Sequence, residues 1–154
     1  MLYKKRIVCS SEEDTKILAQ KFACHTKQGD VFALYGTLGA GKSTFSRYFI
    51  QSLTNISDVP SPTFTLVQTY ETADFNIYHF DMYRIKSPEE AFELDIEEAF
   101  YAGVSLIEWP EKINYLLPKK AIKVKITTIG NERIFDVEAT LDEQQKRLEV
   151  FLSD

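Results

Sequence analysis

Val31-Phe-Ala-Leu-Tyr35 runs directly into Gly36-Thr-Leu-Gly-Ala-Gly-Lys-Ser43, and this segment carries the strongest structural signal in the chain. The first five residues form a continuous apolar run, which is typical of a strand buried on both faces. The next eight match the pattern Gly-x-x-x-x-Gly-Lys-Ser without departure. From Thr44 to Leu53, apolar side chains then recur at helical spacing. A buried strand, a glycine-rich loop and a helix in this order predict a P-loop, a backbone cradle for phosphate groups.

The segments around this motif alternate between strand and helix patterns. Ser11 precedes three carboxylates, with Asp14 at the capping-box position, which predicts the start of a helix. Predicted strands span 2–9, 31–35, 63–70, 75–81 and 104–107, a hairpin pairs 121–128 with 133–140, and predicted helices span 11–28, 44–53, 87–101 (with a break near Leu94-Asp95 left open) and 141–152. This alternation predicts an α/β fold: a P-loop NTPase core with a mixed β-sheet flanked by helices, ending in a β-hairpin and a helix.

Length and composition limit the classes of protein. The chain has 154 residues, which predicts a single domain over residues 1–154, and 44% of them are hydrophobic. Its formal net charge of −5 argues against autonomous binding to nucleic acid or to an anionic membrane, because both need a basic surface. No apolar run is long enough to span a membrane, and two cysteines make no disulfide framework. We therefore expect a cytosolic protein.

The P-loop assigns chemistry to individual residues. Its glycines allow backbone N–H groups to turn toward an anion, and the following helix presents its positive end to the same phosphates. Lys42 is expected to reach the terminal phosphates, and the Ser43 hydroxyl is expected to bind Mg²⁺. The predicted nucleotide-binding residues of the loop are Gly36, Thr37, Leu38, Gly39, Ala40, Gly41, Lys42, Ser43 and Thr44.

Two carboxylates stand at the carboxyl ends of predicted strands, where α/β sheets bind ligands. Glu108 follows Val104-Ser-Leu-Ile107, and Asp81 follows Ile77-Tyr-His-Phe80. One acid could ligate or orient the metal while the other positions the attacking water. Glu108 is the better candidate for the metal and Asp81 for the water, but the reverse division stays open.

Four nearby side chains have two readings each. Thr63 and Thr65 lie where nucleotide switches place a phosphate-sensing threonine, or they are solvent-facing strand residues. Trp109 is either a wall of the site or part of the core. His79, in an aromatic strand, reads as a buried and satisfied core histidine rather than a catalytic base.

Four motifs together resemble the TsaE (YjeE) family of bacterial ATPases. They are Tyr35-Gly-Thr-Leu-Gly-Ala-Gly-Lys-Ser-Thr-Phe45, Ser61-Pro-Thr-Phe-Thr-Leu-Val67, Tyr78-His-Phe-Asp-Met-Tyr-Arg84 and Leu106-Ile-Glu-Trp-Pro-Glu111, and their order and spacing match across about residues 8 to 140. The chain departs from the family at Thr37, where an Asp is common, and at Ser43, where Thr is commoner. The second departure keeps the metal-binding hydroxyl.

The resemblance implies a function and a set of partners. The family supports threonylcarbamoyladenosine modification of tRNA next to the anticodon, as an ATPase that acts with TsaD and TsaB and meets tRNA through that complex. On matched positions it implies Lys42 and Ser43 at the phosphates and Mg²⁺, Glu108 as the metal-associated acid, Asp81 as a second essential carboxylate, and Trp109, Arg133 and the Ser11 region near the ATP. The alternative is a stand-alone small-molecule or nucleoside kinase.

Overall fold

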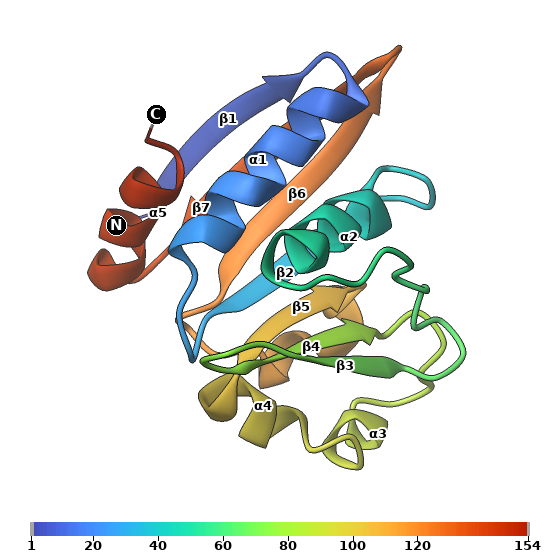
Figure 1. The fold of residues 1–154 in the computed structure, drawn as a ribbon. Coiled ribbons are helices and arrows are strands. Elements are labelled where there is room, and N and C mark those ends of the chain that lie inside the picture. The colour runs from blue at the N-terminus through green and yellow to red at the C-terminus, as the bar shows by residue number, and fades with distance from the viewer. Residues whose placement is uncertain (1, 154) are drawn as a thin grey trace.

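One mixed sheet of seven strands organises the computed structural model, which describes residues 2–153 (Figure 1). The strands are β1 (Tyr3–Cys9), β2 (Val31–Tyr35), β3 (Val67–Glu71), β4 (Asn76–Asp81), β5 (Val104–Glu108), β6 (Ile122–Ile129) and β7 (Glu132–Ala139). The helices are α1 (Glu12–His25), α2 (Lys42–Leu53), α3 (Glu89–Phe92), α4 (Ile96–Ala102), α5 (Asp142–Phe151) and the 3₁₀ helix η1 (Pro110–Leu116). The strand order is β1-β7-β6-β2-β5-β4-β3.

Parallel strands form the centre of the sheet and antiparallel strands form its two sides. β2 pairs in parallel with both β5 and β6, and β5 pairs in parallel with β4. β7 and β1 extend the sheet antiparallel beyond β6, and β3 closes the opposite edge against β4. The mixed α/β sheet and the C-terminal hairpin and helix that the sequence predicts are confirmed.

Helices cover the two faces of the sheet with separate apolar clusters. α1, α2 and α5 enclose an aromatic cluster on one face, in which the Phe22 ring stacks on Phe151 at 5.0 Å and meets Phe45 edge-on at 5.6 Å. α3, α4 and η1 enclose a second cluster on the other face, around Phe80 and Ile107. Figure 1 shows α1 and α2 side by side across the sheet. Within residues 2–153, no helix is both long and apolar enough to cross a membrane.

The parallel strands bring three chain segments together at the carboxyl-terminal end of the sheet. β2 ends at Tyr35, where the glycine-rich loop begins, while β5 ends at Glu108 and β4 at Asp81. In the strand register Glu108 is the partner of both Asp81 and Leu34. The two acids are therefore fixed beside the P-loop by backbone pairing.

Several element boundaries differ from the predicted ones. The strand predicted over 63–70 starts only at Val67, because Leu66 adopts a left-handed conformation (φ 69°) and its N–H closes a turn onto the Pro62 carbonyl. The helical region 87–101 has the break that the sequence left open near Leu94-Asp95: Asp95 is also left-handed (φ 56°) and separates α3 from α4. η1 was not predicted; it begins with Pro110, a residue favoured in a first helical turn.

Candidate functional site

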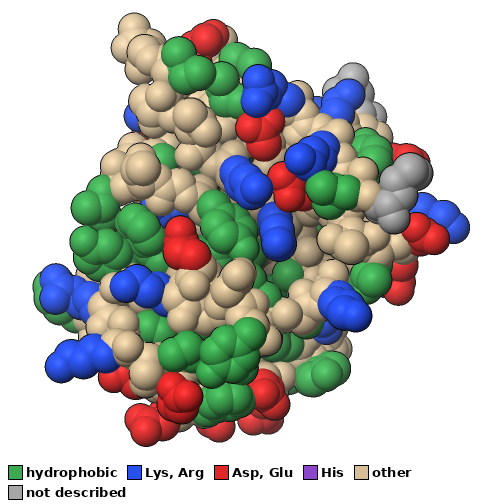
Figure 2. Space-filling view, turned by 180° about the vertical axis from the view of Figure 1, so that it is seen from behind, with side chains coloured by type: hydrophobic (Ala, Val, Ile, Leu, Met, Phe, Trp, Pro, Cys, Tyr) green, Lys and Arg blue, Asp and Glu red, His purple; other side chains and the backbone are tan. Residues whose placement is uncertain are grey.

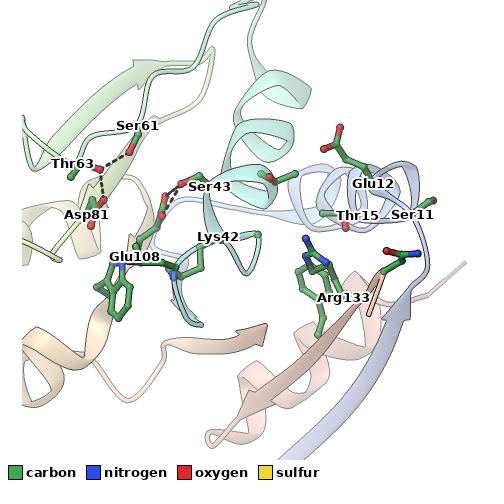
Figure 3. Close-up of a pocket in the computed structure, with 17 residues that line it drawn as sticks. Ser11, Glu12, Thr15, Lys42, Ser43, Ser61, Thr63, Asp81, Glu108 and Arg133 are labelled. Carbon is green, nitrogen blue, oxygen red and sulfur yellow. Dashed lines mark hydrogen bonds between the residues drawn. The ribbon is translucent and has the colours of Figure 1, made fainter. Parts of the chain in front are cut away.

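A cavity of about 300 Å³ lies where the P-loop meets the ends of β4 and β5 (Figure 3). Its volume is at the lower end of the range for ligand pockets. The lining residues are Ser11, Glu12, Thr15, Leu38, Gly39, Gly41, Lys42, Ser43, Thr44, Ser61, Thr63, Asp81, Glu108, Trp109, Asn131, Arg133 and Phe135. Every predicted site residue except Gly36, Thr37 and Ala40 is among them.

Glycine is required at two positions of the loop for different reasons. Gly41 precedes α2 with φ 118°, a left-handed conformation that other residues adopt at a cost. At Gly36, a Cβ atom would lie 2.9 Å from the Ile126 carbonyl oxygen, so the loop could not pack against β6. Gly41, the N-cap residue of α2, has no side chain with which to cap the helix, and the first turn of α2 lines the cavity through Lys42, Ser43 and Thr44. This end of the helix is suited to a phosphate group.

Lys42 is 4% exposed and its ammonium group faces the loop. Nζ donates to the carbonyl oxygens of Gly36, at 2.5 Å, and Thr37, at 3.0 Å. Burial lowers the pKa of Lys42 from its ordinary 10.5, while the negative charge of Glu108 acts in the opposite direction. The loop therefore holds a cation whose burial costs free energy, and an anionic ligand beside the Lys42 ammonium group would offset that cost.

Ser43 and Glu108 are joined by a direct hydrogen bond. Ser43 Oγ donates to Glu108 Oε1 at 3.0 Å and lies 3.3 Å from Oε2. On its other side, Glu108 Oε2 lies 2.6 Å from Nε2 of His79, and both side chains are almost completely buried. The predicted burial of His79 is correct, but the ring contacts the candidate metal-site acid, and no partner lies at its Nδ1 within residues 2–153.

Asp81 is held by a separate set of donors. Thr63 Oγ1 donates to Asp81 Oδ2 at 2.9 Å, and the Tyr83 N–H donates to Oδ1 at 3.0 Å. Thr63 has a single hydroxyl proton, so Ser61 is the donor in the 2.7 Å contact between the two hydroxyls. These contacts favour the site reading of Thr63 over the strand reading (Figure 3).

Thr65, unlike Thr63, does not contact a site acid. Its side chain is exposed and accepts a hydrogen bond from Gln68 at 3.1 Å, so it faces solvent as the second reading expects, although it lies in the turn before β3 and not in a strand. Two residues of the same type in the same loop therefore separate into one that contacts a site acid and one that does not.

Trp109 forms a wall of the cavity and also packs against the second apolar cluster. Its indole lies with its centre 4.2 Å from Lys42 Nζ and 4.8 Å from the Tyr83 ring. Its backbone is left-handed (φ 58°), a conformation that costs a non-glycine residue roughly 1–3 kcal/mol and is concentrated at functional sites. The indole is thus both a site wall and a core residue.

Ser11 and Arg133 approach the cavity from the far side of the loop (Figure 3). Ser11 caps α1 by accepting from the Asp14 N–H at 3.2 Å. Arg133 lies near the start of β7, and its Nε is 3.9 Å from the place a Cβ on Gly41 would occupy. Sequence reasoning missed Glu12, Thr15, Asn131 and Phe135, which flank these two residues. The pairing of Cys9 with Arg133 between β1 and β7 brings the two segments together, and no local motif reveals it.

The donor set fits a nucleotide phosphate with a hard divalent cation. Within residues 2–153, no group of three or more His, Cys, Asp or Glu side chains forms a complete metal cage. A P-loop protein does not need one, since Mg²⁺ is held there by one hydroxyl, one or two carboxylates, phosphate oxygens and water. Ser43, Glu108 and Asp81 line the same cavity as the loop and supply those protein oxygens.

Comparison with known proteins identifies relatives over most of the chain. Residues 9–135 match the family model described as "Threonylcarbamoyl adenosine biosynthesis protein TsaE". Relatives named "tRNA threonylcarbamoyladenosine biosynthesis protein TsaE" include one from Rickettsia typhi, 46% identical over 80% of this chain and 87% of its own length. Another, from Bacillus subtilis, is 38% identical over 78% of this chain and 75% of its own length.

A solved structure agrees with the sequence relatives. The crystal structure of Bacillus subtilis YdiB superposes with a TM-score of 0.80 and 30% sequence identity, covering 98% of this chain and 95% of that one. Sequence and three-dimensional structure thus point the same way, and the chain belongs to the TsaE family.

Proposed function

We propose that this protein is an ATP-binding and ATP-hydrolysing subunit required for threonylcarbamoyladenosine modification of tRNA. The observation that carries the proposal is that a complete P-loop and two strand-end acids line one cavity. The relatives of the chain are named for the same biosynthesis. The modification concerns tRNA, so we place the protein in the cytoplasm.

The P-loop supplies the proposed nucleotide contacts. The N–H groups at the start of α2 bind phosphate oxygens, and Lys42 leaves the Gly36 and Thr37 carbonyls to bind the terminal phosphates. The Ser43 hydroxyl donates its proton to Glu108, so its oxygen lone pairs would be available to hold Mg²⁺. When bound, Mg²⁺ neutralises the charge that develops on the phosphates.

The two acids take different roles in this proposal. Glu108 is hydrogen-bonded to the metal-site hydroxyl, so we assign it to the Mg²⁺ environment. Asp81 is bonded to Thr63 and to the Tyr83 backbone rather than to the P-loop, so we assign it to orienting the attacking water.

The charge on the molecule supports a partner-dependent role toward tRNA. On the sheet face opposite α1, basic side chains of β1 and β6 pair with acidic side chains of β7: Arg6 with Asp136 at 2.8 Å, Lys4 with Glu138 at 3.8 Å and Lys125 with Glu138 at 3.2 Å. Figure 2, the view from behind, accordingly shows positive and negative side chains side by side. With a net charge of −5 as well, we expect feeble binding to free tRNA.

TsaD and TsaB are the proposed partners. The segment from Pro60 to Thr65 is the proposed docking face, together with the P-loop surface. Thr63 in that segment contacts Asp81, whereas the neighbouring Phe64 is 81% exposed. A change in nucleotide state at Asp81 can thus be passed to an exposed apolar side chain.

Product analysis separates this function from the kinase alternative. Incubation with ATP labelled on its terminal phosphate should give free phosphate slowly, and TsaD, TsaB and tRNA together should accelerate its release. Transfer of the label to a small-molecule or nucleoside acceptor, without stimulation by the partners, would instead support a kinase. The family relationship does not favour that outcome.

A further inference from the structure

We propose that His79 is a positioning residue that holds Glu108, and through Glu108 sets the direction in which the Ser43 hydroxyl faces the metal. The proposal rests on the proposed function, since it concerns the same Mg-ATP site. It assigns a role to a buried ring that lies behind the cavity and is absent from its lining.

The geometry places Glu108 between two donors. His79 Nε2 lies 2.6 Å from Oε2, and Ser43 Oγ lies 3.0 Å from Oε1. A carboxylate only accepts hydrogen bonds, so Nε2 carries the proton in the first contact and Oγ in the second. His79 is 1% exposed and Glu108 2%, so the contact between these two side chains is shielded from water.

The unpartnered nitrogen shows which tautomer the site accepts. Within residues 2–153 no hydrogen-bond partner lies at His79 Nδ1. A neutral ring with its proton on Nε2 leaves only a lone pair unmatched there, whereas a proton on Nδ1 would add an unmatched buried donor. The single donor of the ring is thus committed to Glu108.

Strand pairing explains why this contact can control Ser43. His79 and Asp81 are two residues apart in β4, so their side chains lie on the same face of the sheet. The strand register sets Asp81 opposite Glu108 on β5. β4 therefore carries both the second acid and the group that orients the first. With Glu108 fixed from behind, the Ser43 proton has a fixed acceptor, and the lone pairs of Ser43 Oγ face away from Glu108.

Two amide variants test whether the side chain at position 79 must contact Glu108. In His79→Gln the amide nitrogen can occupy about the place of Nε2, whereas in His79→Asn the shorter side chain cannot reach Glu108. The measurement is the dissociation constant of a non-hydrolysable ATP analogue, by calorimetry, with excess Mg²⁺ and with EDTA; the ratio of the two constants reports the contribution of the metal.

We expect His79→Asn to reduce this ratio by roughly tenfold or more, which is the usual loss when a residue supporting a metal ligand is removed. The EDTA value should stay as in the wild type, and His79→Gln should restore most of the ratio. Phe80→Leu is the matched control, because Phe80 is fully buried in the same strand but belongs to the cluster on the opposite face. It should lower the melting temperature and leave the ratio unchanged.

A double variant distinguishes positioning from general damage. If His79 acts through Glu108, then His79→Asn should have no further effect on the ratio in a Glu108→Ala background. Additive effects, a wild-type ratio in His79→Asn, or an equal loss in Phe80→Leu would each overturn the proposal while leaving the proposed function intact. A wild-type protein whose affinity for the analogue is unaffected by Mg²⁺ would overturn both.

Discussion

The ammonium group of Lys42 lies 4.2 Å from the centre of the Trp109 indole ring, which makes the only tryptophan of the chain a direct neighbour of the phosphate-binding lysine. Cation–π contacts of this kind contribute about 0.5–2 kcal/mol. The same ammonium also bonds the Gly36 and Thr37 carbonyls. Any ligand that draws Lys42 toward a phosphate must therefore change the surroundings of the indole.

Tryptophan fluorescence should report nucleotide binding for this reason. We expect a saturable change in Trp109 emission on adding Mg-ATP, and no such change in Lys42→Ala. Lys120→Ala is a suitable control, because Lys120 contacts a different ring, that of Tyr101, at 4.9 Å. An emission spectrum that stays constant at saturating nucleotide would contradict the placement of Trp109 in the site wall.

Magnesium titration of the ATPase rate should separate the two acids. Glu108→Ala should raise the Mg²⁺ concentration needed for half-maximal rate by roughly 10–100-fold, because it removes the acceptor of the Ser43 hydroxyl. Asp81→Asn should leave this concentration and nucleotide affinity nearly unchanged, and lower turnover by roughly 10²–10⁴-fold. Identical metal dependence in the two variants would refute the assignment.

Thr63 and Thr65 offer a matched pair of substitutions. Thr63→Val keeps the shape of the side chain but removes the hydroxyl that donates to Asp81. A hydrogen bond to a charged group is worth about 1.5–3 kcal/mol, so turnover should fall by roughly 10–100-fold. Thr65→Val should be close to wild type, since the Thr65 side chain is exposed and bonds Gln68 rather than a site acid. Equal effects of the two changes would remove Thr63 from the mechanism.

The buried cation of Lys42 should affect stability at alkaline pH. Because burial lowers the pKa of Lys42, the unfolded chain binds more protons than the folded one between the folded-state pKa and the ordinary 10.5. The free energy of unfolding therefore gains a positive slope with pH over that window. Lys42→Met has no titrating group at this position. The free energy of unfolding of the wild type should therefore rise relative to that of Lys42→Met as pH rises toward 10.5. Urea unfolding across this window measures the difference, and parallel pH profiles would contradict the expectation.

The centre of the fold could be predicted from the sequence because its signals are local. A buried strand, a glycine-rich loop and a helix follow one another between Val31 and Leu53, and Glu108 and Asp81 each end an apolar strand. The capping role of Ser11 was likewise visible in the three carboxylates that follow it. Each of these features depends on residues close together in the chain.

The remaining features depend on contacts between distant segments. The 63–66 segment shows strand-like alternation, but it forms a turn. The Leu66 N–H donates to the Pro62 carbonyl, and the Leu66 carbonyl accepts from the Asp81 N–H. The C-terminal hairpin lies inside the sheet rather than at its edge, because β1 pairs with β7 over a separation of more than a hundred residues. The contact of His79 with Glu108 also follows only from the β4–β5 register.

The yield of modified tRNA over many turnovers tests the central claim most directly. TsaD and TsaB would be combined with tRNA, ATP and a threonylcarbamoyl donor, and modified adenosine per complex measured with this protein, without it, and with Lys42→Ala in its place. The account predicts repeated turnover only with the wild-type protein, because Lys42 is the cation of the P-loop. An equal yield in all three reactions would contradict it.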